Sequence, residues 1–180
     1  MRGRLKRAAF ELYSERGYDR TTTAEIAERA GVTERTFFRH FPDKREVVFE
    51  GEADMLAALS AAVAEAPADL GPMDVMLWTM RFFEQVLEEN RATNAPRQKI
   101  IADTPALRER QIAKSAAMIA AVAEALERRG VEEKAASLTA SAGMTVLEHA
   151  TRAWFADPSV SLSTHFQREL QALHRLSAAS

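Results

Sequence analysis

Apolar residues recur every three or four positions along almost the whole chain, which is the spacing of helices that bury one face. Near the N-terminus, Leu5, Ala8, Leu12 and Tyr13 follow this spacing, and Gly17 marks the end of the first predicted helix. No segment alternates apolar and polar residues in the way that a half-buried strand does. The pattern therefore predicts an all-α protein with about nine helices.

Two short helices are predicted next, because residues typical of helix ends mark their limits. The stretch TTAE, from Thr22 to Glu25, is a capping box, in which each end residue bonds the backbone of the other. The second helix ends at Gly31, and Thr33 caps a third helix that stops before Pro42. Three short helices with this tight turn between the second and the third predict a helix-turn-helix head.

A larger helical body is predicted after the head. The pattern DKRE, which starts at Asp43, is a second capping box, so we expect one long helix from there to about residue 66. Residues 73–89 are apolar on two faces and residues 135–147 carry no charge, which favours helices that are packed on most sides. The predicted domains are a helix-turn-helix head and a helical body, residues 1–42 and 43–180.

The two helices nearest the C-terminus have more apolar surface than one small bundle needs. One interpretation is that they complete the core of a single subunit. The other is that they pair with their copies as a four-helix bundle in a two-fold homodimer. For the second interpretation, the candidate interface residues are Leu147, Leu162, Phe166, Leu170 and Leu173.

The third predicted helix, within TERTFFRHF (residues 33–41), mixes aromatic and basic residues. At about 100° per residue, Phe37 and Phe41 share one side and would face the core. Arg35 and Arg39 then lie on the opposite side, one turn apart, with Thr36 beside them. Phe38 and His40 flank this outward face, one on each side. Glu34 points sideways.

Such an exposed ridge suits a helix in the major groove of DNA, because arginine can bond O6 and N7 of guanine together. The hydroxyls of Thr22 and Thr23, at the start of the second helix, are placed for a phosphate. Lys44 is placed for another phosphate. A single surface arginine is usually just solvated, so this prediction depends on the whole set.

Composition and charge indicate the class of protein and the compartment in which we expect it. An apolar fraction of 47% with 28% charged residues is typical of soluble globular proteins. The absence of cysteine excludes disulfides, thiolate nucleophiles and cysteine metal sites. The net charge is −2, but residues 1–50 carry 11 Lys and Arg against 9 Asp and Glu, which places a mild positive charge near the N-terminus. No apolar run approaches the roughly 20 residues of a membrane span, and Glu11 comes too early for a signal peptide. We expect a cytoplasmic protein.

The segment GYDRTTTAEIAERAGVTERTFFRHFPDKREVV, residues 17–48, resembles the DNA-binding domain of the TetR/AcrR family of bacterial transcriptional repressors. The matching residues are Gly17, Tyr18, Thr22, Ile26, Ala27, Ala30, Gly31, Val32, Phe38, Phe41 and Lys44. The resemblance implies a homodimer that binds a pseudo-palindromic operator, and a variable helical body that senses a small apolar or amphipathic effector and then releases the DNA. The implied DNA contacts are Thr22, Glu34, Arg35, Thr36, Phe38, Arg39, His40 and Lys44.

One residue departs from the family pattern. Relatives commonly have tyrosine at the position of Phe38, and its hydroxyl can reach a phosphate. Without that hydroxyl, the bond is missing, a loss of about 0.5–1.5 kcal/mol.

The sequence shows no catalytic set, no metal site and no cofactor motif. It has no glycine-rich phosphate loop, and its four histidines lack the spacing of a helical metal pair. Aromatic, methionine and histidine residues of the body are core by default, but they can also form the wall of an apolar ligand pocket. The candidate pocket residues are Trp78, Phe82, Met118, Met144, His149 and Trp154. Two other functions stay open, namely a helical ligand-binding or adaptor protein that binds no operator and an all-helical enzyme.

Overall fold

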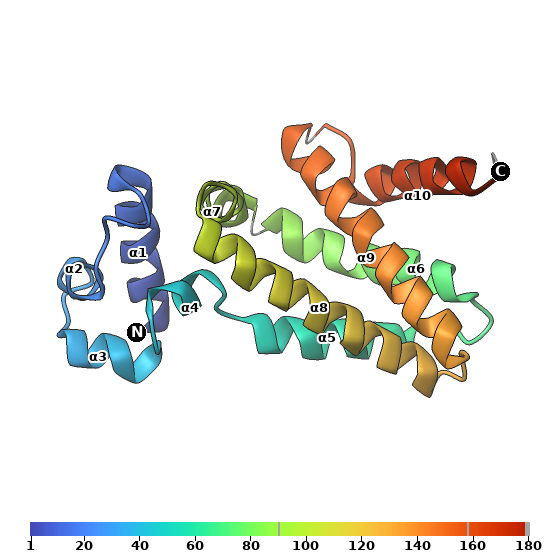
Figure 1. The fold of residues 1–180 in the computed structure, drawn as a ribbon, viewed down its shortest axis with the longest axis horizontal. Helices are drawn as coiled ribbons and strands as arrows, with labels where there is room; N and C mark the ends of the chain where they lie inside the picture. Colours follow the sequence, from blue (N-terminus) through green and yellow to red (C-terminus); the bar gives the residue numbers. More distant parts are fainter. Residues whose placement is uncertain (90, 158, 179–180) are drawn as a thin grey trace. The chain divides into compact units, whose positions relative to one another are not determined.

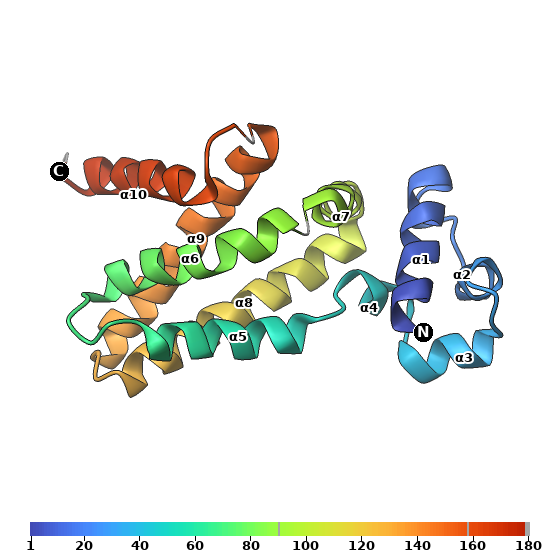
Figure 2. The ribbon, with the colours of Figure 1, turned by 180° about the vertical axis from the view of Figure 1, so that it is seen from behind.

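The structure is a computed structural model that describes residues 1–89, 91–157 and 159–178, without the side chains of some helical residues, Phe82 among them. These described residues form ten helices and no strand, which confirms the all-α prediction (Figures 1 and 2). The helices are α1 (Arg2–Arg16), α2 (Thr23–Arg29), α3 (Glu34–His40), α4 (Lys44–Val48), α5 (Glu52–Glu65), α6 (Pro72–Glu89), α7 (Arg91–Asp103), α8 (Pro105–Arg128), α9 (Glu133–Ala156) and α10 (Leu162–Ala178). Within the described ranges, no helix has both the length and the apolar character of a membrane-spanning segment.

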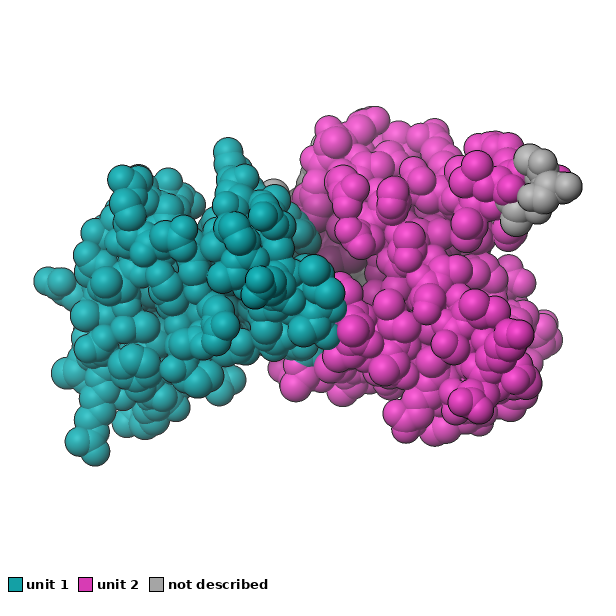
Figure 3. All heavy atoms as spheres, in the orientation of Figure 1, with its two compact units in different colours: residues 1–52, 91–113 teal, residues 53–90, 114–180 magenta. Residues whose placement is uncertain are grey.

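The chain folds into two compact units, which Figure 3 shows in different colours. Unit 1 consists of Met1–Glu52 and Arg91–Ala113, and unit 2 of Ala53–Asn90 and Lys114–Ser180. Residues 91–113 therefore belong to the same unit as the three-helix head, although they are distant in sequence. The sequence predicted a boundary after residue 42 that separates a DNA-binding head from a sensing body. This boundary concerns function, which the two compact units do not test, so it stays a prediction.

Unit 1 is built on the apolar faces that the helical spacing predicts. Leu5 and Leu12 of α1 are buried, as is Phe37 of α3, and they share one core with Ile101 of α7 and Leu107 of α8. Burial of such side chains is the main stabilising contribution to a unit of this size. The three helices of the head are thus held together by a core to which α7 and α8 also contribute.

The predicted long helix from Asp43 to about residue 66 is wrong. Asp43 does cap α4, since its side chain accepts hydrogen bonds from the amides of Arg45 and Glu46, but α4 ends at Val48. Gly51 follows with a φ of 84°, a left-handed conformation that interrupts the helix, and α5 begins at Glu52. The chain therefore has a short α4 and a separate α5.

Unit 2 has one apolar core to which α5, α6, α8, α9 and α10 all contribute. Its largest fully buried side chains include Trp154 of α9 and Phe166 of α10. At the end of α5, the guanidinium of Arg129 donates to the carbonyls of Ala66 and Pro67, each at 2.6 Å. These bonds satisfy two carbonyls that follow directly after the end of α5.

The helices α9 and α10 also have an exposed side. The prediction that residues 135–147 are packed on most sides is wrong, because Leu138 is 62% exposed and Ser141 and Thr145 are exposed as well. These residues share one side of α9, opposite the buried Ala136 and Ala140. In α10, Leu173 and Leu176 are 37% and 75% exposed.

Candidate nucleic-acid interface

Helix α3 presents the side that the sequence predicts. Phe37 and Phe41 are 0% and 3% exposed, whereas Arg35 and Arg39 are exposed. Phe38 is 51% exposed, and its ring meets that of Phe37 edge to face, with centroids 5.5 Å apart. The buried ring of Phe37 thus supports the exposed ring of Phe38 beside the two arginines.

Two hydroxyls that are predicted to meet DNA have partners inside the chain. Thr23 Oγ1 donates to Glu34 Oε1 at 2.5 Å, which ties the start of α2 to the start of α3. The hydroxyls of Thr33 and Thr36 lie 3.1 Å apart, and Thr33 Oγ1 accepts from the amide of Thr36. Glu34 and Thr36 are therefore held in place before any DNA binds.

The capping box at the start of α2 is confirmed. Thr22 Oγ1 accepts from the amide of Glu25 at 3.3 Å, and Glu25 Oε2 accepts from the amide of Thr22 at 2.8 Å. Hydrogen bonds from the backbone and the side chain of Thr22 lower the pKa of Glu25 below its ordinary value. Arg16 of α1 pairs with the same carboxylate at 2.9 Å, so the start of α2 is fixed to α1.

Lys44 does not extend freely into solvent. Its ammonium donates to the carbonyls of Tyr18 at 2.8 Å and Thr21 at 2.9 Å, and it lies 4.2 Å from the centre of the Tyr18 ring. Burial lowers the pKa of Lys44 below its ordinary value, against the opposing effect of Asp19. The predicted contact of Lys44 with a phosphate stays untested.

Two side chains whose hydrogen bonds the sequence did not predict help to fix the head. The hydroxyl of Tyr13 donates to the carbonyl of Lys44 at 2.9 Å, and burial raises the pKa of this tyrosine well above its ordinary value. The guanidinium of Arg4 donates to the carbonyl of Ala30, at the end of α2. These partners are 31 and 26 residues apart in the chain, so no local pattern reveals them.

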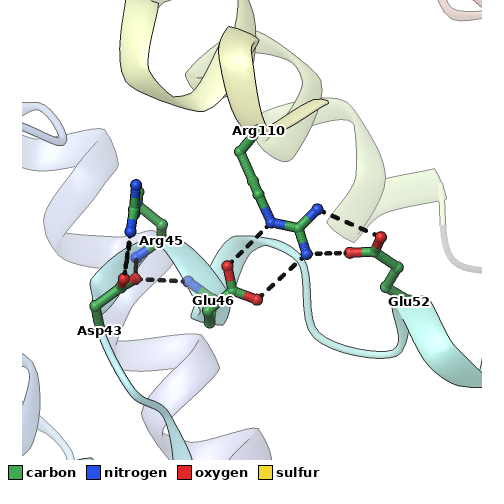
Figure 4. A network of polar contacts seen from close by, with 5 residues as sticks. All are labelled: Asp43, Arg45, Glu46, Glu52 and Arg110. Carbon is green, nitrogen blue, oxygen red and sulfur yellow. Dashed lines mark hydrogen bonds and ion pairs between the residues drawn. The ribbon is translucent and has the colours of Figure 1, made fainter. Parts of the chain in front are cut away.

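Arg110 of α8 forms hydrogen bonds to α4 and to the start of α5 (Figure 4). Its guanidinium donates to both oxygens of Glu46, at 3.1 and 3.5 Å, and to Glu52 Oε2 at 2.5 Å. Figure 4 shows it between the two carboxylates, while Arg45 bonds Asp43 at the start of α4. Glu46 therefore bonds Arg110, whereas in a capping box it would bond back to the backbone at Asp43.

Arg97 of α7 holds the end of α4. Its Nε donates to the carbonyl of Val48 at 2.7 Å, and its guanidinium lies 5.7 Å from the centre of the Phe49 ring. Burial lowers the pKa of Arg97 below its ordinary value. Both ends of this five-residue helix are thus held by side chains from other elements of unit 1.

Two family models match the chain. Residues 5–50 match the model of the bacterial regulatory proteins of the tetR family, and residues 70–177, more than half of the chain, match the MftR C-terminal domain. The chain belongs to the tetR family of bacterial regulatory proteins. The first match covers most of α1 and all of α2, α3 and α4, so the exposed side of α3 lies within it.

Individual relatives match different parts of the chain. The regulator TcmR of Streptomyces glaucescens is 40% identical over 80 residues, which are 44% of this chain and 35% of TcmR. The first curated relatives are therefore matched over only about a third of their own length. A candidate mycofactocin biosynthesis regulator of Mycobacterium tuberculosis, MftR, is 24% identical over 86% of this chain and 80% of its own length.

Solved structures share the whole fold. The TetR-family repressor FadR of Thermus thermophilus, in complex with lauroyl-CoA, is 25% identical, with a TM-score of 0.60 over 96% of this chain and 93% of its own. SmeT, the repressor of a multidrug efflux pump of Stenotrophomonas maltophilia, is 20% identical, with a TM-score of 0.64 over 94% of this chain and 86% of its own. The second likeness is one of fold alone.

Unit 2 of this tetR-family chain brings four of the predicted pocket residues to one core. Met144 and Trp154 are buried in it, and Trp78 and Met118 pack against it partly buried. His149 is exposed, so its predicted place in an apolar pocket is wrong; it lies about 140° around α9 from Trp154. Phe82 lies outside the residues whose side chains the structure describes.

The predicted dimer residues also differ in burial: some are enclosed in the core of unit 2 and others are partly or fully exposed. Leu162 and Phe166 are 0% exposed inside the core of unit 2, so their side chains are not available to a second chain. This part of the interface prediction is wrong, because both residues lie on the side of α10 that completes the subunit. Leu147 and Leu170 are partly buried against the same core, and Leu173 is exposed.

Among the described residues, no group of histidines and carboxylates is placed to hold a metal ion. Several charged residues of unit 1 pair with one another, as Arg29 does with Glu15 at 2.8 Å. The described interactions of this unit thus serve to fix its helices in place.

Proposed function

We propose that this chain is a ligand-responsive transcriptional repressor that binds a pseudo-palindromic operator as a homodimer. The observation that carries the proposal is the exposed side of α3, on which Arg35 and Arg39 stand beside the supported ring of Phe38. Arginine on such a ridge suits the edges of guanine in the major groove. Around it, Thr22, Thr23, Thr36 and His40 are the further proposed contacts.

The proposed dimer contact is the exposed side of α9 and α10 in unit 2. It includes Leu138, Leu173 and Leu176, three large apolar residues that are 62%, 37% and 75% exposed. A two-fold pairing of these helices would cover them from water, which favours association. The two copies of α3 would then read successive major grooves, about 34–36 Å apart.

The experiment that tests this function is selection of bound sequences from a random pool of double-stranded DNA. We expect a palindrome whose half-sites are separated by about one helical turn. An adaptor protein without operator binding would instead enrich no sequence and show no salt-dependent binding at low ionic strength. A repressor of this kind acts on the chromosome, so we propose a cytoplasmic location.

The proposed effector is a small apolar or amphipathic molecule held by unit 2. The structure of FadR contains lauroyl-CoA, so lauroyl-CoA is the first probe, with coenzyme A as the control that lacks the acyl chain. The two tryptophans of the chain, Trp78 and Trp154, both belong to the proposed pocket, so their fluorescence should report binding. Release of operator requires that the effector binds the DNA-free conformation more tightly.

A further inference from the structure

We propose that Glu34 is a specificity-determining residue of the operator contact, and that it selects cytosine by accepting a hydrogen bond from the 4-amino group of that base. This inference rests on the proposed function and deepens it, because it names a base that each half-site of the operator should contain. It also gives a specific role to the one acidic residue on the exposed side of α3.

The exposed side of α3 consists of four residues. Glu34, Arg35, Phe38 and Arg39 are exposed, whereas Phe37 between them is buried. At about 100° per residue, the four exposed residues lie within an arc of about 140°, and Glu34 stands next to Phe38 at one edge of it. If this side of α3 faces the major groove, Glu34 therefore reaches the groove together with the two arginines.

One oxygen of the Glu34 carboxylate is held by α2. Thr23 Oγ1 donates to Glu34 Oε1 at 2.5 Å, between residues that are 11 apart in the chain. An ionised carboxylate has two oxygens with about four acceptor sites, so this bond leaves it able to accept from a second donor. The bond also orders the side chain of Glu34 before DNA binds, which reduces the entropy lost on binding.

The chemistry of the major groove restricts what this carboxylate can bind. A carboxylate has acceptors and no donor, and its charge is repelled by the phosphates. Guanine and thymine offer no donor in this groove, whereas cytosine and adenine each present an amino group. Adenine also presents the acceptor N7 beside its amino group, and this acceptor would repel the second carboxylate oxygen. Cytosine is therefore the base that Glu34 should favour.

Sequence selection with Glu34→Gln tests the inference, because glutamine keeps the shape of the side chain but adds donors. Glutamine can bond N6 and N7 of adenine together. We expect one position of each half-site to change from cytosine in wild type to adenine in the variant, with a preference of about tenfold in each case. A bond to Thr23 that only ties α2 to α3 would change affinity without changing a base. Glu109→Gln, at an exposed glutamate of α8, controls for the loss of one negative charge and should select the wild-type operator.

Two further variants test the same site independently. Glu34→Ala removes the acceptor, so the cytosine preference should be lost and no other base should replace it. Thr23→Val removes the hydroxyl that holds Glu34 and should weaken the cytosine preference without shifting it to adenine. The same base preferences in wild type, Glu34→Gln and Glu34→Ala would overturn the inference. Wild-type protein that selects no DNA sequence would instead refute the proposed function itself.

Discussion

Met76 of α6 packs so closely on Gly143 of α9 that a β-carbon at position 143 would lie 2.8 Å from its Cε and 2.9 Å from its Cγ. Met76 is 0% exposed, so its side chain is enclosed by the core and cannot turn into solvent. The absence of a side chain at Gly143 therefore sets how near the two helices approach in the core of unit 2.

We expect Gly143→Ala to destabilise the protein, because the added methyl overpacks a filled core at a cost of about 1–3 kcal/mol. This cost should exceed the gain that alanine usually gives inside a helix, about 0.8–1 kcal/mol. Denaturant unfolding measures the difference, and Ser141→Ala on the exposed side of α9 is the control. If the clash is the cause, Met76→Ala should cost less in the Gly143→Ala background than in wild type.

Local sequence patterns predicted the helices of the head correctly. They missed features that depend on partners far away in the sequence. The capping box of Thr22 and the inward direction of Phe37 depend on residues within one or two turns, so spacing alone reveals them. The contacts that hold α4 could not be predicted in this way, because Glu46 bonds Arg110, 64 residues away, and the carbonyl of Val48 accepts from Arg97, 49 residues away. Helix α7 was not predicted either, and it contains Pro96, a residue that usually interrupts helices.

The apolar faces of α9 and α10 show the same limit of prediction from local sequence patterns. Leu162 and Leu173 of α10 are both leucines at helical spacing, yet one is 0% and the other 37% exposed. Periodicity identifies an apolar side of a helix but not which part of it the subunit covers. His149 likewise lies between the buried Val146 and Trp154 in sequence but on the exposed side of α9.

Arg35→Ala and Arg39→Ala should each weaken operator binding by about 1–3 kcal/mol and relax the preference for particular base pairs. Both side chains are exposed on α3, so neither change should affect stability by more than about 0.5 kcal/mol. Sequence selection repeated with each variant measures the preference, and Arg128→Ala, an exposed arginine of α8, is the matched control. Unchanged selectivity in both variants would show that another side of the head reads the bases.

Phe38→Tyr should strengthen operator binding by about 0.5–1.5 kcal/mol, because the added hydroxyl can donate to a phosphate. The ring is already exposed and supported by Phe37, so the change needs no rearrangement. Titration of labelled operator measures the gain, and the salt slope should stay constant since the hydroxyl is neutral. Phe38→Leu separates the loss of the ring from the gain of the hydroxyl. Equal affinity of the tyrosine variant and wild type would place this ring away from the phosphates.

Asp43→Asn, at the start of α4, should change how the unfolding free energy of the protein depends on pH. Burial alone would raise the pKa of Asp43, but hydrogen bonds from Arg45 and from the amides of Glu46 and Arg45 outweigh it and lower the pKa below the ordinary value of 3.8. A carboxyl with a lowered pKa in the folded state stabilises above its unfolded pKa and loses this contribution as the pH falls through the folded value.

Asparagine keeps an acceptor for the helix cap but does not titrate, so it isolates the charge. The difference in unfolding free energy between wild type and Asp43→Asn should be constant above about pH 5 and should shrink below about pH 4. Denaturant unfolding across this range measures it, and Asp69→Asn, at an exposed aspartate of unit 2, controls for the loss of one carboxylate. A difference that stays constant down to about pH 3 would mean that the bonds of Asp43 do not depend on its charge.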